Sequence, residues 1–196
     1  MKPKIILATT SPSRRAAFDM LSIDYVAEPS GVEEKFEGRQ EEVKFLVCQL
    51  AQMKADAVAK NHKDGIVIGF DSAGYFNCQV IEKPKTQQEA FERLKALSGR
   101  WFEFYTGIYM INIKEKKTLL KSVKTEIQLR ELSENEIQHY IAKDPRVSTF
   151  ALGFDPLETY ASTFIKEIKG SYNNITRGIP LEVVVEMLYE IGYPKL

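Results

Sequence analysis

The sequence predicts an α/β domain: a mixed, twisted sheet with flanking helices, arranged as two lobes around a central groove. Segments with helical periodicity alternate along the chain with short apolar runs of strand type. Two long strand-like segments, 101–113 and 117–129, follow one another with no helix between them, which implies antiparallel pairing and hence a mixed sheet. With 196 residues, 44% of them hydrophobic, the chain can bury a substantial core, and we expect a single domain over residues 1–196.

Local signals set the expected elements in order. Apolar runs predict strands at 4–8, 25–27, 65–70, 73–77, 79–81, 101–113 and 117–129. Helical periodicity predicts helices at 12–21, 41–61, 86–98, 133–142 and 181–191. Thr86 with Glu89, and Ser133 with Glu136, form capping boxes that begin two of these helices.

Composition limits the partners and the chemistry. Lysines plus arginines equal aspartates plus glutamates at 27 each, so we expect a small anionic ligand rather than a nucleic acid polymer or an acidic membrane. The apolar run at 5–7 is too short for a signal peptide, and no segment approaches the ~20 apolar residues that span a bilayer, so a cytoplasmic protein is expected. Cys48 and Cys78 are expected to be buried thiols, and the isolated His62 and His139 argue against a histidine metal site or a Ser-His-Asp triad.

The segment 7–15 has the features of a phosphate-binding turn, since a strand breaks into a hydroxyl-rich loop and restarts as a helix. Ser11 is a good N-cap, and Pro12 suits the first helical position because proline has no N–H to lose. Arg14 and Arg15 follow in the first turn, where the positive end of the helix disfavours cations unless an anion or solvent compensates. The two arginines therefore either bind phosphate or lie solvated on the helix surface.

Lys54 interrupts the apolar stripe of the helix expected at 41–61. Its ammonium group either extends to the rim of the protein or points into a polar cleft that binds anions. A cation on an apolar stripe costs stability unless it is solvated or paired. The replacement Lys54→Met is therefore expected to preserve or raise the melting temperature while it abolishes most activity.

Four more charged residues lie in expected loops. Asp71 comes directly after the strand 65–70, at a carboxyl-terminal strand edge where α/β sheets bind ligands, although a turn residue has the same pattern. Lys83, Glu33 and Glu34, each taken alone, read as solvated loop residues. Together with the arginines and Lys54, these residues supply cations for a polyphosphate and carboxylates for a hard divalent cation, a combination that suits phosphoanhydride chemistry.

Eight short motifs follow one another along the chain: Leu7–Arg15, Gly31–Glu34, Leu50–Ala55, Gly69–Ser72, Glu82–Pro84, Leu97–Gly99, Tyr105–Gly107 and Gly178–Leu181. In order and spacing they resemble the motifs of the Maf (septum-formation inhibitor) family over nearly the whole chain. The resemblance implies a fold related to the inosine-triphosphate pyrophosphatases. It also implies hydrolysis of a nucleoside triphosphate to a monophosphate and pyrophosphate with Mg²⁺ or another divalent cation, such as Mn²⁺ or Co²⁺.

The resemblance also implies roles for individual residues. Phosphates would be held by Ser11, Arg14 and Arg15. The triphosphate would be stabilised by Lys54 and Lys83. Asp71 would be the catalytic carboxylate, and a metal ion would be held by Asp71 with Glu33 or Glu34.

The chain departs from the family pattern between Arg146 and Tyr160, where many members have a Lys-Ala-Gly-like stretch followed by a Gln or Glu. No lysine stands there in this chain. Glu158 is the candidate for the late acidic or amide residue, with Asp155 as the alternative. A carboxylate that faces the base accepts hydrogen bonds from a guanine-type edge, so Glu158 predicts a guanine-type substrate.

A second hypothesis, from another class, is a nucleotide-binding regulator of cell division that has lost catalysis, since the family name refers to septum formation. The carboxylates and lysines of the candidate site favour the enzyme, because a pure binder could dispense with the carboxylates. Relatives commonly form homodimers, and we carry a homodimer over as an expectation.

Overall fold

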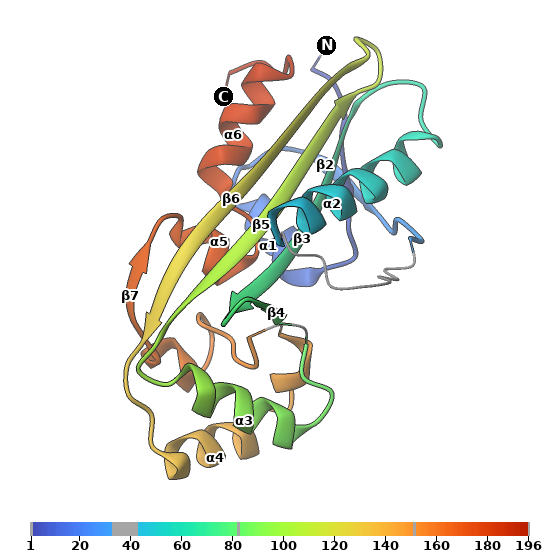
Figure 1. Ribbon diagram of the computed structural model, residues 1–196. Coiled ribbons are helices and arrows are strands. Elements are labelled where there is room, and N and C mark those ends of the chain that lie inside the picture. Colours follow the sequence, from blue (N-terminus) through green and yellow to red (C-terminus); the bar gives the residue numbers. More distant parts are fainter. Residues whose placement is uncertain (1, 33–42, 82, 151, 196) are drawn as a thin grey trace. The chain divides into compact units, whose positions relative to one another are not determined.

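The computed structural model describes residues 2–32, 43–81, 83–150 and 152–195 (Figure 1). The strands are β1 (Ile5–Ala8), β2 (Tyr25–Glu28), β3 (Ile66–Phe76), β4 (Gln79–Ile81), β5 (Trp101–Asn112), β6 (Lys117–Leu129) and β7 (Ile165–Lys169). The helices are α1 (Pro12–Asp19), α2 (Val43–Ala59), α3 (Gln87–Leu97), α4 (Glu134–Lys143), α5 (Tyr172–Arg177) and α6 (Leu181–Glu190), with short 3-10 helices at Val147–Thr149 and Tyr160–Thr163. No helix in these ranges is long and apolar enough to cross a membrane.

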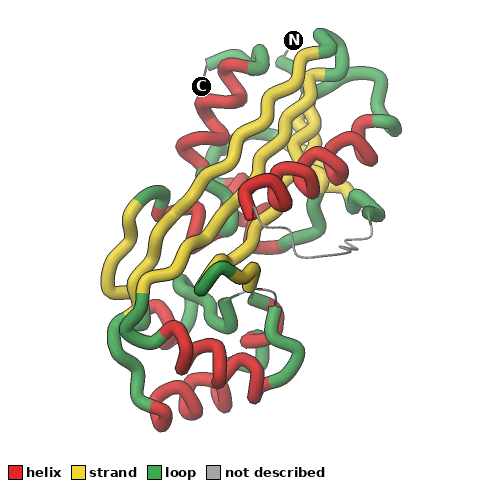
Figure 2. Tube along the Cα trace, viewed as in Figure 1, coloured by secondary structure: helices red, strands yellow, loops and turns green. Residues whose placement is uncertain are grey.

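The strands form a seven-stranded sheet in the order β2-β1-β3-β5-β6-β7, with β4 paired to β3 (Figure 2). Strand β1 pairs in parallel with β2 and β3, whereas the pairs β3–β4 and β6–β7 are antiparallel. A short turn joins β5 to β6, and near their far ends the amide of Leu129 donates to the carbonyl of Arg100 at 3.2 Å, as in an antiparallel pair. The predicted mixed α/β sheet with flanking helices is confirmed.

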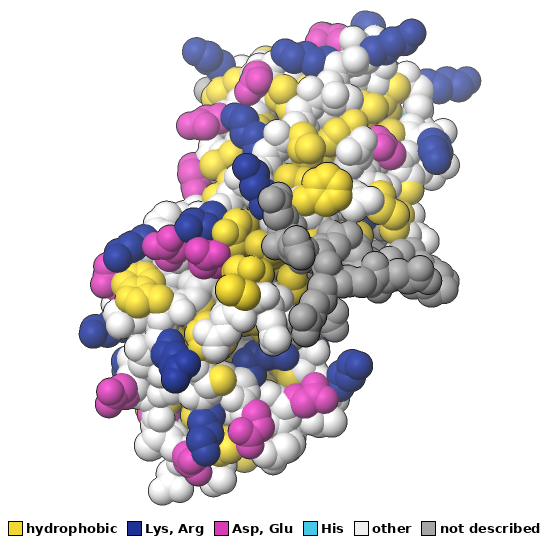
Figure 3. Space-filling view, in the orientation of Figure 1, with side chains coloured by type: hydrophobic (Ala, Val, Ile, Leu, Met, Phe, Trp, Pro, Cys, Tyr) yellow, Lys and Arg dark blue, Asp and Glu magenta, His cyan; other side chains and the backbone are white. Residues whose placement is uncertain are grey.

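The chain divides into two compact units. Unit 1 comprises residues 1–72, 106–123 and 177–196, and unit 2 comprises residues 73–105 and 124–176. Strands β3, β5 and β6 contribute residues to both units, because the boundaries fall within them. Basic and acidic side chains are interspersed over the face shown in Figure 3, which matches their equal numbers of 27 each.

Unit 1 buries apolar side chains on both faces of its strands, because successive residues of a strand point to opposite sides. Ile5 and Ile66 pack with residues of α1 and α6, whereas Ile6 and Val67 pack with residues of α2. Figure 1 shows α2 on one side of these strands and α1 and α6 on the other. Helix α2 therefore covers one face of these strands, and α1 and α6 cover the other.

Unit 2 has a separate core between α3, α4 and its own parts of the strands. The N-cap half of each predicted capping box is confirmed, since the amide of Glu89 donates to Thr86 at 3.1 Å and that of Glu136 to Ser133 at 3.3 Å. The side chains of Glu89 and Glu136 accept instead from the amide of Lys85 and from Arg130. The Tyr140 and Phe164 rings meet edge to face with centroids 5.3 Å apart. Burial raises the pKa of Tyr140 to about 12.

The structure corrects three predictions. The segments 65–70 and 73–77 form one continuous strand, β3, so Asp71 lies within a strand rather than after one. The sequence predicted no element between α4 and α6, where β7 and α5 lie, because both are too short to show a clear period. Cys78 is exposed rather than buried, since Asn77 and Cys78, at φ 49° and 61°, form the tight turn between β3 and β4, and Cys48 is partly buried.

Candidate active site

The loop between β1 and α1 is built from hydroxyl side chains. Ser11 is the N-cap of α1, as predicted, and its Oγ accepts a hydrogen bond from the amide of Arg14 at 3.4 Å. Thr9 is buried and accepts from the amide of Ser11 at 3.1 Å. Pro12 has no N–H, and the amide of Arg15 donates to the carbonyl of Ser11 at 3.1 Å, so the amide of Ser13 is the first-turn donor that remains for a phosphate oxygen.

Arg14 lies against β3. Its Nη1 donates to the carbonyl of Phe70 and its Nη2 to the hydroxyl of Ser72, each at 3.0 Å. The guanidinium carbon also lies 6.0 Å from the centroid of the Phe70 ring. These contacts exclude the alternative in which Arg14 is solvated on the helix surface. Arg15, by contrast, is exposed and lines an open depression beside Tyr25.

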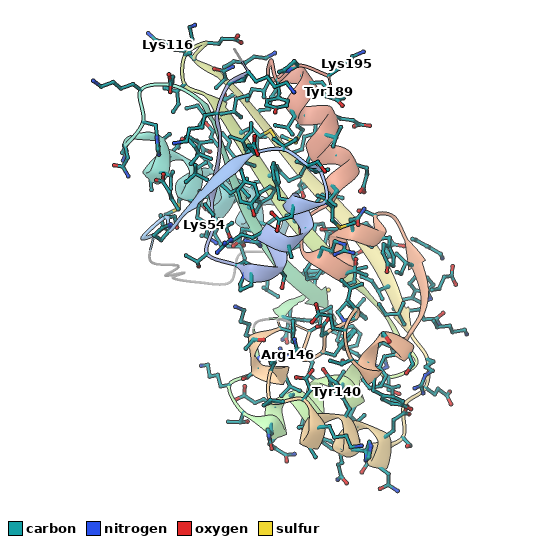
Figure 4. All side chains as sticks on the ribbon, turned by 180° about the vertical axis from the view of Figure 1, so that it is seen from behind. Lys54, Lys116, Tyr140, Arg146, Tyr189 and Lys195 are labelled. Carbon is teal, nitrogen blue, oxygen red and sulfur yellow. The ribbon has the colours of Figure 1, made fainter. Side chains whose placement is uncertain are left out.

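Lys54 and Asp71 form a buried ion pair. Lys54 Nζ lies 2.6 Å from Asp71 Oδ1, and each residue is 8% exposed. Lys54, labelled in Figure 4, comes from α2 and lies among the elements of unit 1. The pairing excludes a lysine that extends to the rim. It also explains how an apolar stripe tolerates a cation, since a buried charge needs a partner.

Two glycines set the approach of α2 to the sheet. A Cβ at Gly69 of β3 would lie 2.0 Å from the carbonyl oxygen of Ala51, and one at Gly107 of β5 would lie 2.2 Å from that of Val47. Only a residue without a side chain fits at either position, so the backbone of α2 lies directly on the strands. Lys54 follows one helical turn after Ala51, and this close packing brings it to the aspartate two residues after Gly69.

Asp71 lies beyond the part of β3 that pairs with β1. The parallel register ends where Ala8, the last residue of β1, pairs with Gly69. Asp71 therefore lies at the carboxyl end of the parallel strands, even though β3 continues to Phe76. Ligands of α/β sheets bind at this end. The sequence predicted the right location from a wrong strand boundary.

Three residues that the sequence did not single out as site residues link β3, β5 and the segment before α6; they are Ser72, Thr106 and Gly178. The Ser72 hydroxyl lies 2.8 Å from that of Thr106 and donates to the carbonyl of Gly178 at 3.2 Å. Thr106 is fully buried. Ser72 and Thr106 are polar residues within strands that are otherwise mostly apolar, and that pattern is the signal that could have indicated them.

Lys83 and Glu158 belong to unit 2, where Lys83 is exposed. Glu158 and its alternative, Asp155, both contact Arg146, a labelled residue of unit 2 in Figure 4, at 3.3 and 3.6 Å respectively. Asp155 is buried and accepts from the amide of Leu157 at 2.9 Å, whereas the Glu158 side chain is 70% exposed. Asp155 thus stabilises its own loop, and Glu158 is the more accessible carboxylate.

The proposed metal ligands are described only in part. Glu33 and Glu34 lie outside the described residues, and within the described ranges no group of three His, Cys, Asp or Glu side chains could hold a metal ion. Mg²⁺ commonly binds one or two carboxylates together with substrate phosphates. Asp71 fits one such protein ligand.

The fold and the site define an α/β protein in which a buried lysine–aspartate pair lies at the carboxyl end of parallel strands, beside a helix that can bind phosphate. The family model described as Maf-like protein matches residues 4–191, and the chain belongs to this family.

Curated relatives of this chain carry the name dTTP/UTP pyrophosphatase, and three of them illustrate the similarity. That of Thermotoga maritima is 34% identical over 196 residues, covering 98% of this chain and 92% of its own. That of Dictyoglomus thermophilum is 30% identical over 197 residues and 100% of both chains. A Bacillus cereus relative is 35% identical over 186 residues and 94% of both chains.

The solved structure of the Staphylococcus aureus Ham1 protein is similar in fold. It covers 95% of this chain and 98% of its own, with a TM-score of 0.51 at 14% sequence identity. At this identity the similarity shows a shared fold alone.

Proposed function

We propose that this protein is a nucleoside triphosphate pyrophosphatase that hydrolyses the α–β phosphoanhydride, with dTTP and UTP as its preferred substrates. The observation that carries the proposal is the buried Lys54–Asp71 pair, in a chain whose relatives are named dTTP/UTP pyrophosphatases. The family match over 4–191 supports one catalytic domain that includes both units. A homodimer and a cytoplasmic location stay predictions.

In the proposed reaction, phosphate oxygens bind at the N-terminus of α1, near Ser11, Arg14 and Arg15. The Lys54 ammonium neutralises charge on the phosphates and orients the carboxylate of Asp71, from which it lies 2.6 Å away. Asp71 accepts a proton from the attacking water. The water oxygen then forms a bond to phosphorus, and the P–O bond to the pyrophosphate leaving group breaks. Positioning and charge neutralisation supply most of the acceleration in phosphoryl transfer.

A divalent cation, Mg²⁺, Mn²⁺ or Co²⁺, belongs to the proposal as the companion of the triphosphate. When bound, it supplies charge neutralisation on the phosphate oxygens. Asp71 is the proposed ligand of the cation among the described residues, and Glu33 or Glu34 is the proposed second ligand. Lys83, a residue of unit 2, stays a proposed ligand of the phosphates.

The names of the relatives favour a pyrimidine base over the guanine-type base that Glu158 alone predicts. The ion pair between Glu158 and Arg146 supports a pyrimidine base. A carboxylate paired with a guanidinium offers donors beside its acceptor, and uracil and thymine present two carbonyl groups around one N–H. A bare carboxylate would face those carbonyls unfavourably.

The test is the release of pyrophosphate from dTTP, UTP and GTP by the purified chain with Mg²⁺. We expect Asp71→Asn to lower kcat by roughly 100-fold or more, the size of a general-base contribution, while the fold is retained. Asp64→Asn, at an exposed aspartate of the same unit, is the matched control and should retain wild-type turnover.

The reaction products identify the bond that is cleaved, and the relative rates with dTTP, UTP and GTP identify the preferred base. Orthophosphate plus a nucleoside diphosphate as primary products would contradict cleavage at the α–β bond. A preference for GTP would overturn the pyrimidine assignment and leave the reaction intact. The regulator hypothesis, which the relatives do not support, requires nucleotide binding without turnover.

A further inference from the structure

We propose that Ser72 is a positioning residue of the hydrolysis, which holds Asp71 in place from the opposite face of β3. This inference rests on the proposed function and deepens it, because it names a residue that acts through Asp71 rather than on the substrate.

The Ser72 hydroxyl uses its full hydrogen-bonding capacity within the protein. It accepts from Arg14 Nη2 at 3.0 Å and donates its single proton to the carbonyl of Gly178 at 3.2 Å. Since that proton is used, the Thr106 hydroxyl, 2.8 Å away, is the donor in their contact. One hydroxyl group therefore connects α1, β3, β5 and the segment before α6.

Arg14 binds both sequence neighbours of Asp71, one through its backbone and the other through its side chain. Its Nη1 donates to the carbonyl of Phe70, the residue before Asp71, and its Nη2 donates to Ser72, the residue after it. The planar guanidinium has a rigid arrangement of donors, so it fixes both neighbours at once. The backbone that carries the Asp71 carboxylate is thus held on both sides.

Strand geometry separates the support from the reacting group. Successive side chains of a strand point to opposite faces. Asp71 contacts Lys54 of α2, whereas Ser72 contacts Arg14 of α1 on the other face. Ser72 therefore stabilises the position of Asp71 from behind the strand. A carboxylate that must meet a water and a phosphorus atom tolerates little displacement, since a misplacement of about 1 Å can cost roughly 100-fold in rate.

The experiment compares Ser72→Ala with Ser72→Thr in steady-state pyrophosphate release. Loss of the hydroxyl is expected to lower kcat about 10- to 100-fold and to change KM less, because Asp71 loses its support whereas Arg14, a proposed phosphate ligand, keeps its bond to the carbonyl of Phe70. Ser72→Thr keeps a hydroxyl and should restore most of the rate. Ser122→Ala, at a half-buried serine of β6 in the same unit, is the matched control.

A double-mutant cycle separates positioning from general destabilisation. In the Asp71→Asn background, Ser72→Ala should have little further effect on kcat, because the group that it positions is already disabled. An equal fold-loss in both backgrounds, or wild-type kcat for Ser72→Ala, would overturn the inference.

A crystal structure of the Ser72→Ala protein gives a second test that needs no turnover. We expect the Asp71 carboxylate to be displaced from its position in the wild-type protein. An unmoved carboxylate would overturn the inference whether or not the wild type releases pyrophosphate. Absence of pyrophosphate release from every triphosphate by the wild type would instead overturn the proposed function.

Discussion

Replacement of Lys54 by methionine tests the buried ion pair directly. The pair reverses the expectation from sequence that Lys54→Met preserves or raises stability. In the folded protein the change removes an ammonium group 2.6 Å from a carboxylate that is itself 8% exposed. Removal of one partner of a buried pair typically costs about 3–5 kcal/mol, and each kcal/mol shifts Tm by roughly 2–4 °C at this chain length. The melting temperature of Lys54→Met should therefore fall by about 6–20 °C.

The assay is thermal unfolding followed by circular dichroism, with turnover measured on the same samples. Lys54→Met and the double variant Lys54→Met/Asp71→Asn should both be inactive, but the double variant should melt higher, because the carboxylate charge is also gone. Two inactive proteins of different stability separate the catalytic loss from the folding loss. Lys44→Met, at an exposed lysine of α2, is the control and should melt near the wild type.

Two results would refute this reasoning. One is a Lys54→Met protein that melts at or above the wild-type temperature with Asp71 intact. The other is a double variant that is destabilised by the sum of its two single changes, since residues in direct contact should not act additively.

Three further predictions follow from other parts of the structure. Gly69→Ala should lower both Tm and kcat, because its Cβ would lie 2.0 Å from a backbone carbonyl oxygen of α2 and would displace that helix. Arg130 lowers the pKa of Glu136 below its ordinary value of 4.5, so the pair stabilises the fold above that pH. The Tm advantage of the wild type over Glu136→Gln should accordingly disappear as the pH falls through the lowered pKa. Iodoacetamide should alkylate Cys78 before Cys48, since Cys78 is exposed and burial raises the pKa of the Cys48 thiol.

Each of these predictions has a matched control. Gly74→Ala lies in the same strand as Gly69 but would meet only side-chain atoms, at 2.9 Å in the tightest case, so an equal loss there would contradict the argument. Glu134→Gln changes a more exposed carboxyl group of α4 and should show a smaller pH effect than Glu136→Gln. Alkylation of a Cys78→Ser protein at the wild-type rate would show that Cys48 is the reactive thiol.

Local sequence signals were sufficient to predict most of the helices and strands and the class of the protein. Ser11, Thr86 and Ser133 begin helices because each accepts a hydrogen bond from an amide three residues later, and this contact depends only on neighbouring residues. The apolar run of β3 and the motifs of the family could likewise be identified without tertiary contacts. The short elements β7 and α5 could not, because neither is long enough to establish a period.

By itself, the sequence determined that Lys54 stands on an apolar stripe and that Asp71 follows a buried strand. Only the tertiary structure decided that the two residues pair, because their contact depends on how closely α2 approaches the sheet at Gly69. The bond from Ser72 to Gly178 joins residues 106 positions apart, and no local pattern encodes such a distance. Local hydrogen bonds and hydrophobic periodicity depend on near neighbours, whereas the partners of buried polar groups depend on packing between distant segments.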